Sequence, residues 1–255
     1  MQNGADISTR VPEYIEKRIR QRVPEGLSIV PDSTPVVAFG DIRKARVVTI
    51  GWNPSWREFL ERDGRRLKQR RLEDLSSLGV SDLSSASGDL IGRVFEACNN
   101  YFCGPNPFKR YFKVLDKLLR PLGASYFNET ACHLDLVQWA TDPVWSKLKP
   151  SQKETLLRAD IPFLRRQLSE EQIELVLLNG SGIADAFQRR LGYQLAGNKV
   201  GDATLFIGRT QQRANIIGWN KNLQQRGVTN QYIEMVAKAI KQFVPNVIRP
   251  PLGHC

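Results

Sequence analysis

The sequence predicts an α/β fold, with one domain in three α/β/α layers around a central, mostly parallel sheet. Three observations lead to this prediction. Apolar runs rich in β-branched residues and bounded by turn signals are typical of buried strands. Longer segments with helical spacing lie between several of these runs, which implies crossover connections between parallel strands. The chain of 255 residues, 41% of them hydrophobic, can bury the core of one large domain.

The expected elements are distributed along most of the chain. Strands are expected at residues 34–41, 46–52, 124–137, 173–180, 203–208 and 214–219. Helices are expected at residues 110–123, 151–168, 182–192 and 229–244. The Ser-rich residues 71–90 predict a long surface loop or an insertion. We see no internal repeat.

Charge gives the first indication of a partner. The formal net charge is +11, and such a surplus of Lys and Arg favours a nucleic acid, whose counterions are released on binding. The run "RRLKQRR" at residues 65–71 contributes to this surplus, although it is equally compatible with a solvated helix face. The sequence has no run of about 18 apolar residues and no apolar stretch behind a charged start. We therefore expect no membrane association and a cytoplasmic protein, associated with the nucleoid in a bacterium.

The cysteines do not predict a metal site. Cys98, Cys103, Cys132 and Cys255 are unevenly spaced and form no CxxC pair or Cys/His ligand cluster. Reduced thiols are expected in a reducing compartment.

The loop after the second expected strand is the first candidate site. The strand runs into Gly51-Trp52-Asn53-Pro54-Ser55, and ligands of parallel sheets bind beyond the carboxyl ends of the strands. Gly lets the backbone approach a ligand closely and Pro stiffens the turn, so the amide of Asn53 is presented in a fixed direction. Asn at such a turn also acts as a cap or turn former, because its side chain bonds nearby backbone.

This loop resembles the first active-site motif of the uracil-DNA glycosylase superfamily, in the thymine/mismatch-specific-like branch that has Asn there. "ASYFNETACHL" (124–134) resembles the second strand of that family, and "ANIIGWNKNLQQRG" (214–227) lies where the family has its second motif. The resemblance covers about residues 34–244. It implies a catalytic domain with a four-stranded central sheet, between an N-terminal helical extension (1–33) and a C-terminal tail (245–255).

The resemblance also implies roles for individual residues. Asn53 would orient the attacking water, and because an amide is not a strong base, the sugar would become cation-like before the attack. Asn128 would bond the edge of the base, a role for which Thr130 competes, while a structural Asn128 is equally compatible with the sequence. Phe102, or failing that Phe108, would stack on the base.

Further base-binding residues are Trp52, Ser55, His133 and Asp135. A small residue at Ser55, where the uracil-restricted branch has Tyr, leaves room for a substituent at the fifth carbon of a pyrimidine. His133 and Asp135 share one face of a strand, where Asp135 could orient the imidazole or bond a base amino group. The alternative is a polar pair at the edge of the sheet.

The second motif departs from the family because its His is absent, and Trp219 or Asn220 stands near that place. Leu223 occupies the position of the apolar wedge that fills the duplex after a nucleotide is extruded, although a leucine is more often a core residue. Phosphate contacts are expected beside it. The whole predicted DNA-binding set is Arg213, Trp219, Asn220, Lys221, Asn222, Leu223 and Arg226.

Together these features predict a monomeric, monofunctional DNA glycosylase that needs no cofactor and no metal. It would flip a damaged or 5-modified pyrimidine (uracil, thymine or a hypermodified base) out of double-stranded DNA, or take it from single-stranded DNA. It would then leave an abasic site, in repair or in defence against phage. One rival is a DNA-binding module of the same fold without catalysis. Another is a nucleotide-binding or phosphate-transfer enzyme built on "LLNGSG" (177–182), which resembles a phosphate-binding turn but lacks the P-loop Lys.

Overall fold

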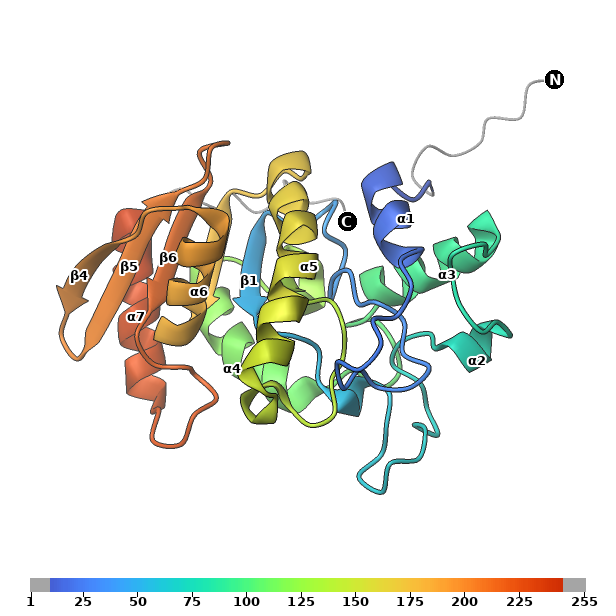
Figure 1. Ribbon diagram of the computed structural model, residues 1–255. Coiled ribbons are helices and arrows are strands. Elements are labelled where there is room, and N and C mark those ends of the chain that lie inside the picture. Colours follow the sequence, from blue (N-terminus) through green and yellow to red (C-terminus); the bar gives the residue numbers. More distant parts are fainter. Residues whose placement is uncertain (1–9, 245–255) are drawn as a thin grey trace, which may run out of the picture.

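Residues 10–244 are described by a computed structural model, and their central feature is a six-stranded, mostly parallel sheet (Figure 1). The strands lie in the order β2-β1-β3-β6-β5-β4; the first four are parallel, and β5 and β4 are antiparallel to their neighbours. The strands are β1 (Val47–Gly51), β2 (Ala131–Asp135), β3 (Leu175–Asn179), β4 (Ala196–Val200), β5 (Ala203–Arg209) and β6 (Asn215–Trp219). The α/β class is confirmed, but the expectation of four strands is wrong because the hairpin β4–β5 extends the parallel part.

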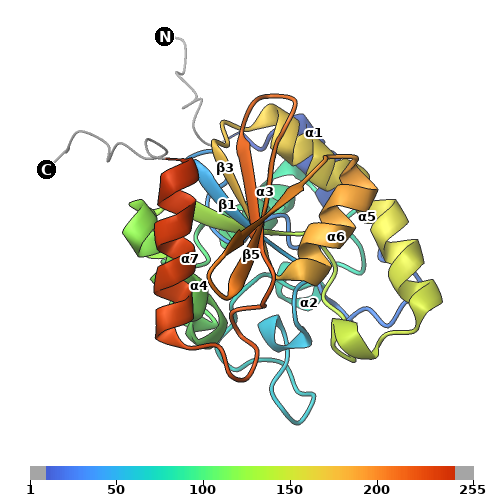
Figure 2. The same ribbon diagram turned by 90° about the vertical axis from the view of Figure 1, so that its left-hand side faces the viewer.

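Helices lie on both sides of the sheet. Figure 2 shows α4 and α7 on one face and α5 and α6 on the other. The α-helices are α1 (Glu13–Ile19), α2 (Leu75–Leu78), α3 (Gly88–Asn99), α4 (Lys109–Leu119), α5 (Pro150–Glu170), α6 (Ser181–Leu191) and α7 (Asn230–Phe243). Short 3-10 helices are η2 (Trp56–Glu58), η3 (Arg120–Leu122), η4 (Tyr126–Asn128) and η5 (Trp145–Lys147). None of the helices in residues 10–244 is long and apolar enough to cross a membrane.

The two strands that position the candidate site are buried along their whole length. Every residue of β1 and β2 is buried, which explains their apolar, β-branched composition, since helices or loops cover both faces of such strands. Their parallel register places Thr49 beside His133 and Gly51 beside Asp135. The loops that follow the two strands therefore begin at the same edge of the sheet.

Several elements differ from those expected. Residues 34–41 are buried but form no strand: only Phe39 makes an isolated bridge, through its backbone, to His133. The edge strand β4 escaped prediction because its sequence, AGNKV, contains Ala, Gly, Asn and Lys, which are depleted in strands, and because most of it is exposed. Helix α3 escaped because it begins inside the Ser-rich stretch.

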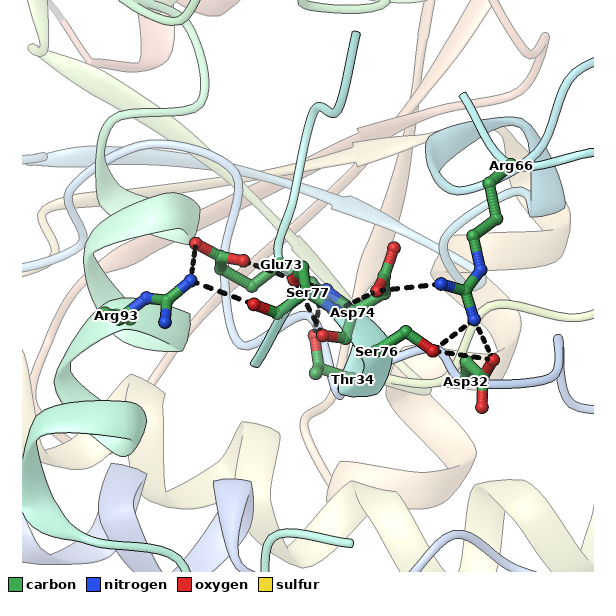
Figure 3. A network of polar contacts seen from close by, with 8 residues as sticks. All are labelled: Asp32, Thr34, Arg66, Glu73, Asp74, Ser76, Ser77 and Arg93. Carbon is green, nitrogen blue, oxygen red and sulfur yellow. Dashed lines mark hydrogen bonds and ion pairs between the residues drawn. The ribbon is translucent and has the colours of Figure 1, made fainter. Parts of the chain in front are cut away.

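The Ser-rich stretch is folded onto the rest of the molecule through a network of polar contacts (Figure 3). Asp74 caps α2 by accepting a hydrogen bond from the Ser77 backbone N–H at 2.7 Å, and Arg93 of α3 pairs with Glu73 at 3.0 Å. Arg66 pairs with Asp32 across the network. The basic run at residues 65–71 is therefore loop rather than helix, and it projects at the edge where β1 ends (Figure 1).

The N-terminal segment is anchored by α1. Ile15 and Ile19 are fully buried where α1 packs against α3 and α5, and Arg18 forms a buried ion pair with Asp160 at 2.8 Å. The tail predicted at residues 245–255 lies outside the described residues. The division into extension, domain and tail stays a prediction.

Candidate active site

A pocket of about 260 Å³ opens at the edge of the sheet where β1 and β2 end. Its walls come from the loop after β1, the end of β2, the start of α4, the region of η5 and the loop after β6. Ligand pockets usually measure roughly 300–1,000 Å³, so this one suits a single base rather than a dinucleotide. The predicted residues that line it are Trp52, Asn53, Ser55, Phe108, His133, Asp135 and Asn222.

The amide nitrogen of Asn53 is held by hydrogen bonds within the protein, whereas its amide oxygen is not. Its Nδ2 donates to the backbone oxygens of Pro54 (2.9 Å) and Trp139 (3.1 Å) and to Thr141 Oγ1 (3.0 Å). Two carbonyl oxygens around one amide atom identify that atom as nitrogen, because oxygen there would be repelled. Within residues 10–244 the Oδ1 atom makes no hydrogen bond, and it is free to accept one from a water in the pocket.

His133 is held in position from behind. Its Nδ1 lies 2.7 Å from Thr49 Oγ1, which also bonds the hydroxyl of Tyr126. A Cβ at Gly51 would stand 2.4 Å from Asp135 Oδ1 and 2.7 Å from His133 Nε2. The position therefore requires glycine, since any side chain there would displace the His133–Asp135 pair.

Asp135 is buried in the pocket wall without adequate partners. The residue is 5% exposed, and Oδ1 has no hydrogen-bond partner in the described part of the chain. The nearest donor-capable atom is His133 Nε2 at 3.4 Å, which is too long for a good hydrogen bond. A buried carboxylate normally has compensating donors, so this one is available to a ligand.

Glu58 is a second buried carboxyl group in the wall. Tyr101 donates a hydrogen bond to its Oε2 at 2.6 Å, and its Oε1 has no hydrogen-bond partner in the part of the chain that the structure describes. Burial raises the pKa of Glu58 to about 7, with a smaller upward contribution from the charge of Asp135; the hydrogen bond from Tyr101 and the charge of Arg71 oppose this shift. Near neutral pH the group can therefore give up or take a proton.

Aromatic rings form the mouth of the pocket. Trp52 stacks on Trp145, with centroids 5.3 Å apart, and Phe108 lies under the guanidinium groups of Arg57 and Arg71. Phe102, our first choice for the stacking ring, does not line the pocket and instead stacks on Tyr126 in the core. Of the two rings predicted to stack on the base, Phe108 is the one that lines the pocket.

Asn128 and Arg213 are among the predicted residues that lie away from the pocket. Asn128 belongs to η4, ahead of β2, where its Oδ1 accepts hydrogen bonds from the backbone and side chain of Thr130. Its expected place in a strand beside the pocket is wrong, as is the same expectation for Thr130. Arg213 lies in the turn before β6, at the opposite edge of the sheet from the pocket. It cannot contact a phosphate beside the site.

The loop after β6 is mostly structural. Trp219 is fully buried, and Asn220 Oδ1 accepts hydrogen bonds from the Thr204 N–H and the Tyr232 hydroxyl. Leu223 is 3% exposed, and its N–H donates to Asn179 Oδ1, so the expected wedge is wrong for this conformation. Lys221, which lies over the Tyr232 ring, and the exposed Arg226 remain candidates for contact with DNA.

The "LLNGSG" turn is explained by packing. Asn179 donates to Gln224 Oε1 at 2.6 Å, and the positive φ of Gly180 (103°) brings the turn against Asn222, whose N atom a Cβ there would meet at 3.1 Å. Its polar groups hold the loop after β6. Ser55 lines the pocket, and its Oγ caps η2 by accepting from the Arg57 N–H; that it leaves room for a 5-substituent stays a prediction.

Sequence reasoning missed several residues of the pocket, among them Glu58, Tyr111 and Trp145. Trp145 follows β2 in the chain, so the rule that ligands bind beyond strand ends could have found it. Glu58 and Tyr111 carry no such signal, because their place depends on how η2 and α4 pack. Across residues 10–244, no group of three or more His, Cys, Asp or Glu side chains is arranged to hold a metal ion.

Neither any family model nor any curated protein significantly matches the chain. The functional conclusion therefore depends on the chemistry of this pocket.

Proposed function

We propose that the protein is a monofunctional DNA glycosylase of the uracil-DNA glycosylase type, with the three-layer α/β/α fold of that family. It hydrolyses the N-glycosidic bond of a damaged or 5-modified pyrimidine nucleotide and leaves an abasic site, without a cofactor. The observation that carries this proposal is the half-fixed amide of Asn53. A hydrogen-bond acceptor is anchored rigidly at a pocket that suits one base, as an enzyme that directs water toward a sugar carbon requires.

The chemistry follows from two groups. Asn53 Oδ1 accepts a hydrogen bond from the attacking water and orients it toward C1′ of the extruded nucleotide. Glu58, in its acid form, gives a proton to the departing base as the C1′–N1 bond breaks. The water oxygen then bonds to C1′, and the proton that it releases returns to the Glu58 carboxylate. Glu58 thus performs the leaving-group role for which the second-motif His is absent.

Recognition of DNA is supported by the charge around the pocket. The chain carries a net charge of +11, and the basic loop at residues 65–71 projects at the edge where β1 ends. Arg57 and Arg71 lie on Phe108 at the mouth. These groups suit phosphates on either side of a nucleotide that has left the base stack. The small Ser55 is compatible both with repair and with removal of a hypermodified phage base.

A base-release assay tests the proposal. Oligonucleotides that each carry one modified pyrimidine are incubated with the protein, and abasic sites are detected by alkali cleavage. We expect release by the wild type, with the rate reduced about 100- to 1,000-fold in Asn53→Ala, the range seen when one positioned polar group is removed from an active site. Asn198→Ala, in the partly exposed edge strand β4, is the matched control and should keep the wild-type rate.

The same assay distinguishes the glycosylase from one rival function. A DNA-binding module without catalysis is favoured by the structural roles of Trp219 and Asn220 in the second-motif loop. It predicts salt-sensitive DNA binding with no base released from any substrate. That result would refute the glycosylase.

A further inference from the structure

The polar groups deep in the pocket bear on which base is accepted, a question that the proposed function leaves open. Glu58, His133 and Asp135 are 3%, 2% and 5% exposed, and all three line the pocket. No Lys or Arg lies among its described lining residues. The interior is therefore rich in hydrogen-bond acceptors and unsuited to a phosphate, which would be repelled by the carboxylate of Asp135. A neutral ligand with N–H donors fits it better.

Asp135 needs such a donor. Its Oδ1 has no hydrogen-bond partner among the described residues, and His133 Nε2 lies 3.4 Å away. His133 cannot move closer freely, because its other ring nitrogen is held by Thr49 at 2.7 Å. Gly51 supplies the space in which the pair stands. The carboxylate is thus kept in a fixed place with unused acceptor capacity, a state that costs stability unless a ligand compensates for it.

The two kinds of pyrimidine present opposite groups to such a wall. Cytosine and its 5-substituted forms carry an exocyclic amino group at position 4, which has two N–H donors, next to the acceptor nitrogen N3. Uracil and thymine carry a carbonyl oxygen at position 4, an acceptor that a carboxylate would repel. The acid form of Glu58 can donate to N3 of a cytosine ring. The pair of carboxyl groups therefore matches the amino-pyrimidine edge.

We propose that the pocket selects a 4-aminopyrimidine, cytosine or a 5-substituted cytosine, with Asp135 accepting from the exocyclic amino group and Glu58 bonding the ring nitrogen N3. This inference rests on the proposed function, and it names the substrate class of that same site. The selection also agrees with the proposed bond cleavage. When the C1′–N1 bond breaks, a proton transferred from Glu58 to N3 allows the cytosine base to leave as a neutral tautomer.

Matched pairs of substrates test the selection. The pairs are cytosine against uracil, 5-methylcytosine against thymine, and 5-hydroxymethylcytosine against 5-hydroxymethyluracil, each placed singly in the same duplex and in the same single strand. We expect the amino member of any pair that reacts to be released at least about tenfold faster. Asp135→Asn, whose amide donates to a 4-carbonyl oxygen, should lower that ratio about tenfold or invert it. Asp74→Asn, which alters a buried carboxylate outside the pocket, should leave the ratio unchanged.

A binding measurement separates this inference from the proposed function. Calorimetry with 2′-deoxycytidine and 2′-deoxyuridine needs no catalysis. If no DNA substrate releases a base but deoxycytidine binds at least tenfold more tightly, and Asp135→Asn abolishes the difference, the glycosylase is refuted and the base selection stands. The selection is overturned if the uracil-type member of a pair is released, or bound, as well as the cytosine-type member or better. It is also overturned if neither base release nor nucleoside binding is observed.

Discussion

Two regions of the molecule bury carboxylates in opposite ways. In the network that anchors the Ser-rich segment, Glu73 pairs with Arg93, Asp32 pairs with Arg66, and Asp74 accepts from the Ser77 N–H (Figure 3). In the pocket, Asp135 and Glu58 have no Lys or Arg in contact among the described residues, and they leave acceptor atoms unused there. Both regions contain buried acids, Asp74 in the network and Glu58 and Asp135 in the pocket, but only the network supplies each of its acids with a partner.

The difference shows how a functional carboxylate can be recognised without a relative to compare. A chain gains stability when it pairs a buried acid, as the network does. An acid that stays unpaired in a wall, next to a second acid whose pKa is displaced, costs stability and is typical of a site that serves a ligand. The contrast makes three quantitative predictions, which differ in the size of the effect.

The largest effect is expected at Glu58. Its pKa is raised from 4.5 to about 7 in the folded protein, so the folded chain binds more protons than the unfolded chain between those values. The stabilising contribution is complete below pH 4.5 and is lost as the pH rises to about 7. Glu58→Gln removes this dependence. Its free energy of unfolding, relative to the wild type, should rise by about 2–4 kcal/mol between pH 4.5 and 8.

Urea unfolding at several pH values measures this difference. The same variant should lose base release about 100-fold or more, because its amide has no acidic proton to give. If the variant is more stable than the wild type at pH 8 but less active, Glu58 costs stability and serves the ligand, as we propose for Asp135. Parallel stability curves for the two proteins would instead show that the pKa of Glu58 is ordinary.

A medium effect is expected when one acid from each region is replaced. Asp74→Ala removes the cap of α2 and should cost about 0.5–2 kcal/mol of unfolding free energy. Asp135→Asn should cost nothing or raise stability, because it removes an uncompensated buried charge while keeping the volume. Thermal unfolding at pH 7 measures both. A loss at Asp135 equal to that at Asp74 would mean that the pocket acid is a structural partner.

The smallest effect concerns the cations. Arg57 forms no ion pair within residues 10–244, whereas Arg93 of α3, outside the basic loop, pairs with Glu73 in the network. Arg57→Gln should lower the slope of log affinity for DNA against log salt concentration by about 1, and Arg93→Gln should leave it unchanged. Fluorescence anisotropy over a range of salt concentrations is sufficient. Equal slopes for both variants would show that DNA does not contact the protein at Arg57, beside the pocket opening.

The sequence predicted what depends on local pattern. Alternating strands and helices gave the parallel sheet, and the rule that ligands bind beyond strand ends led to Asn53. The period of two along a strand brought His133 and Asp135 to one face. The prediction that Asn128 lies in a strand was wrong because the chain turns at Glu129, where φ is 61°. Strand β2 therefore begins only after this turn.

The rest depends on contacts between distant parts of the chain. Glu58 is buried because Tyr101, 43 residues away, bonds its carboxyl group. Leu223 is drawn into the core because Asn179, 44 residues before it, holds its backbone. Composition and periodicity describe short stretches of sequence, and no short stretch contains both members of either pair. They therefore cannot predict where Glu58 and Leu223 lie in the fold.

The fixed register between β1 and β2 has a consequence for how a substrate enters. Thr49 faces His133 and Gly51 faces Asp135 along a buried ladder of backbone hydrogen bonds. Neither strand can slide without losing several of these bonds, so the strand ends that lead into Asn53 and carry His133 and Asp135 keep their spacing when a ligand binds. Under the proposed function the conformational work of the encounter belongs to the nucleic acid. Rotation of one nucleotide out of the stack, easiest at a mismatch or lesion, then becomes the first selective step, before any contact inside the protein.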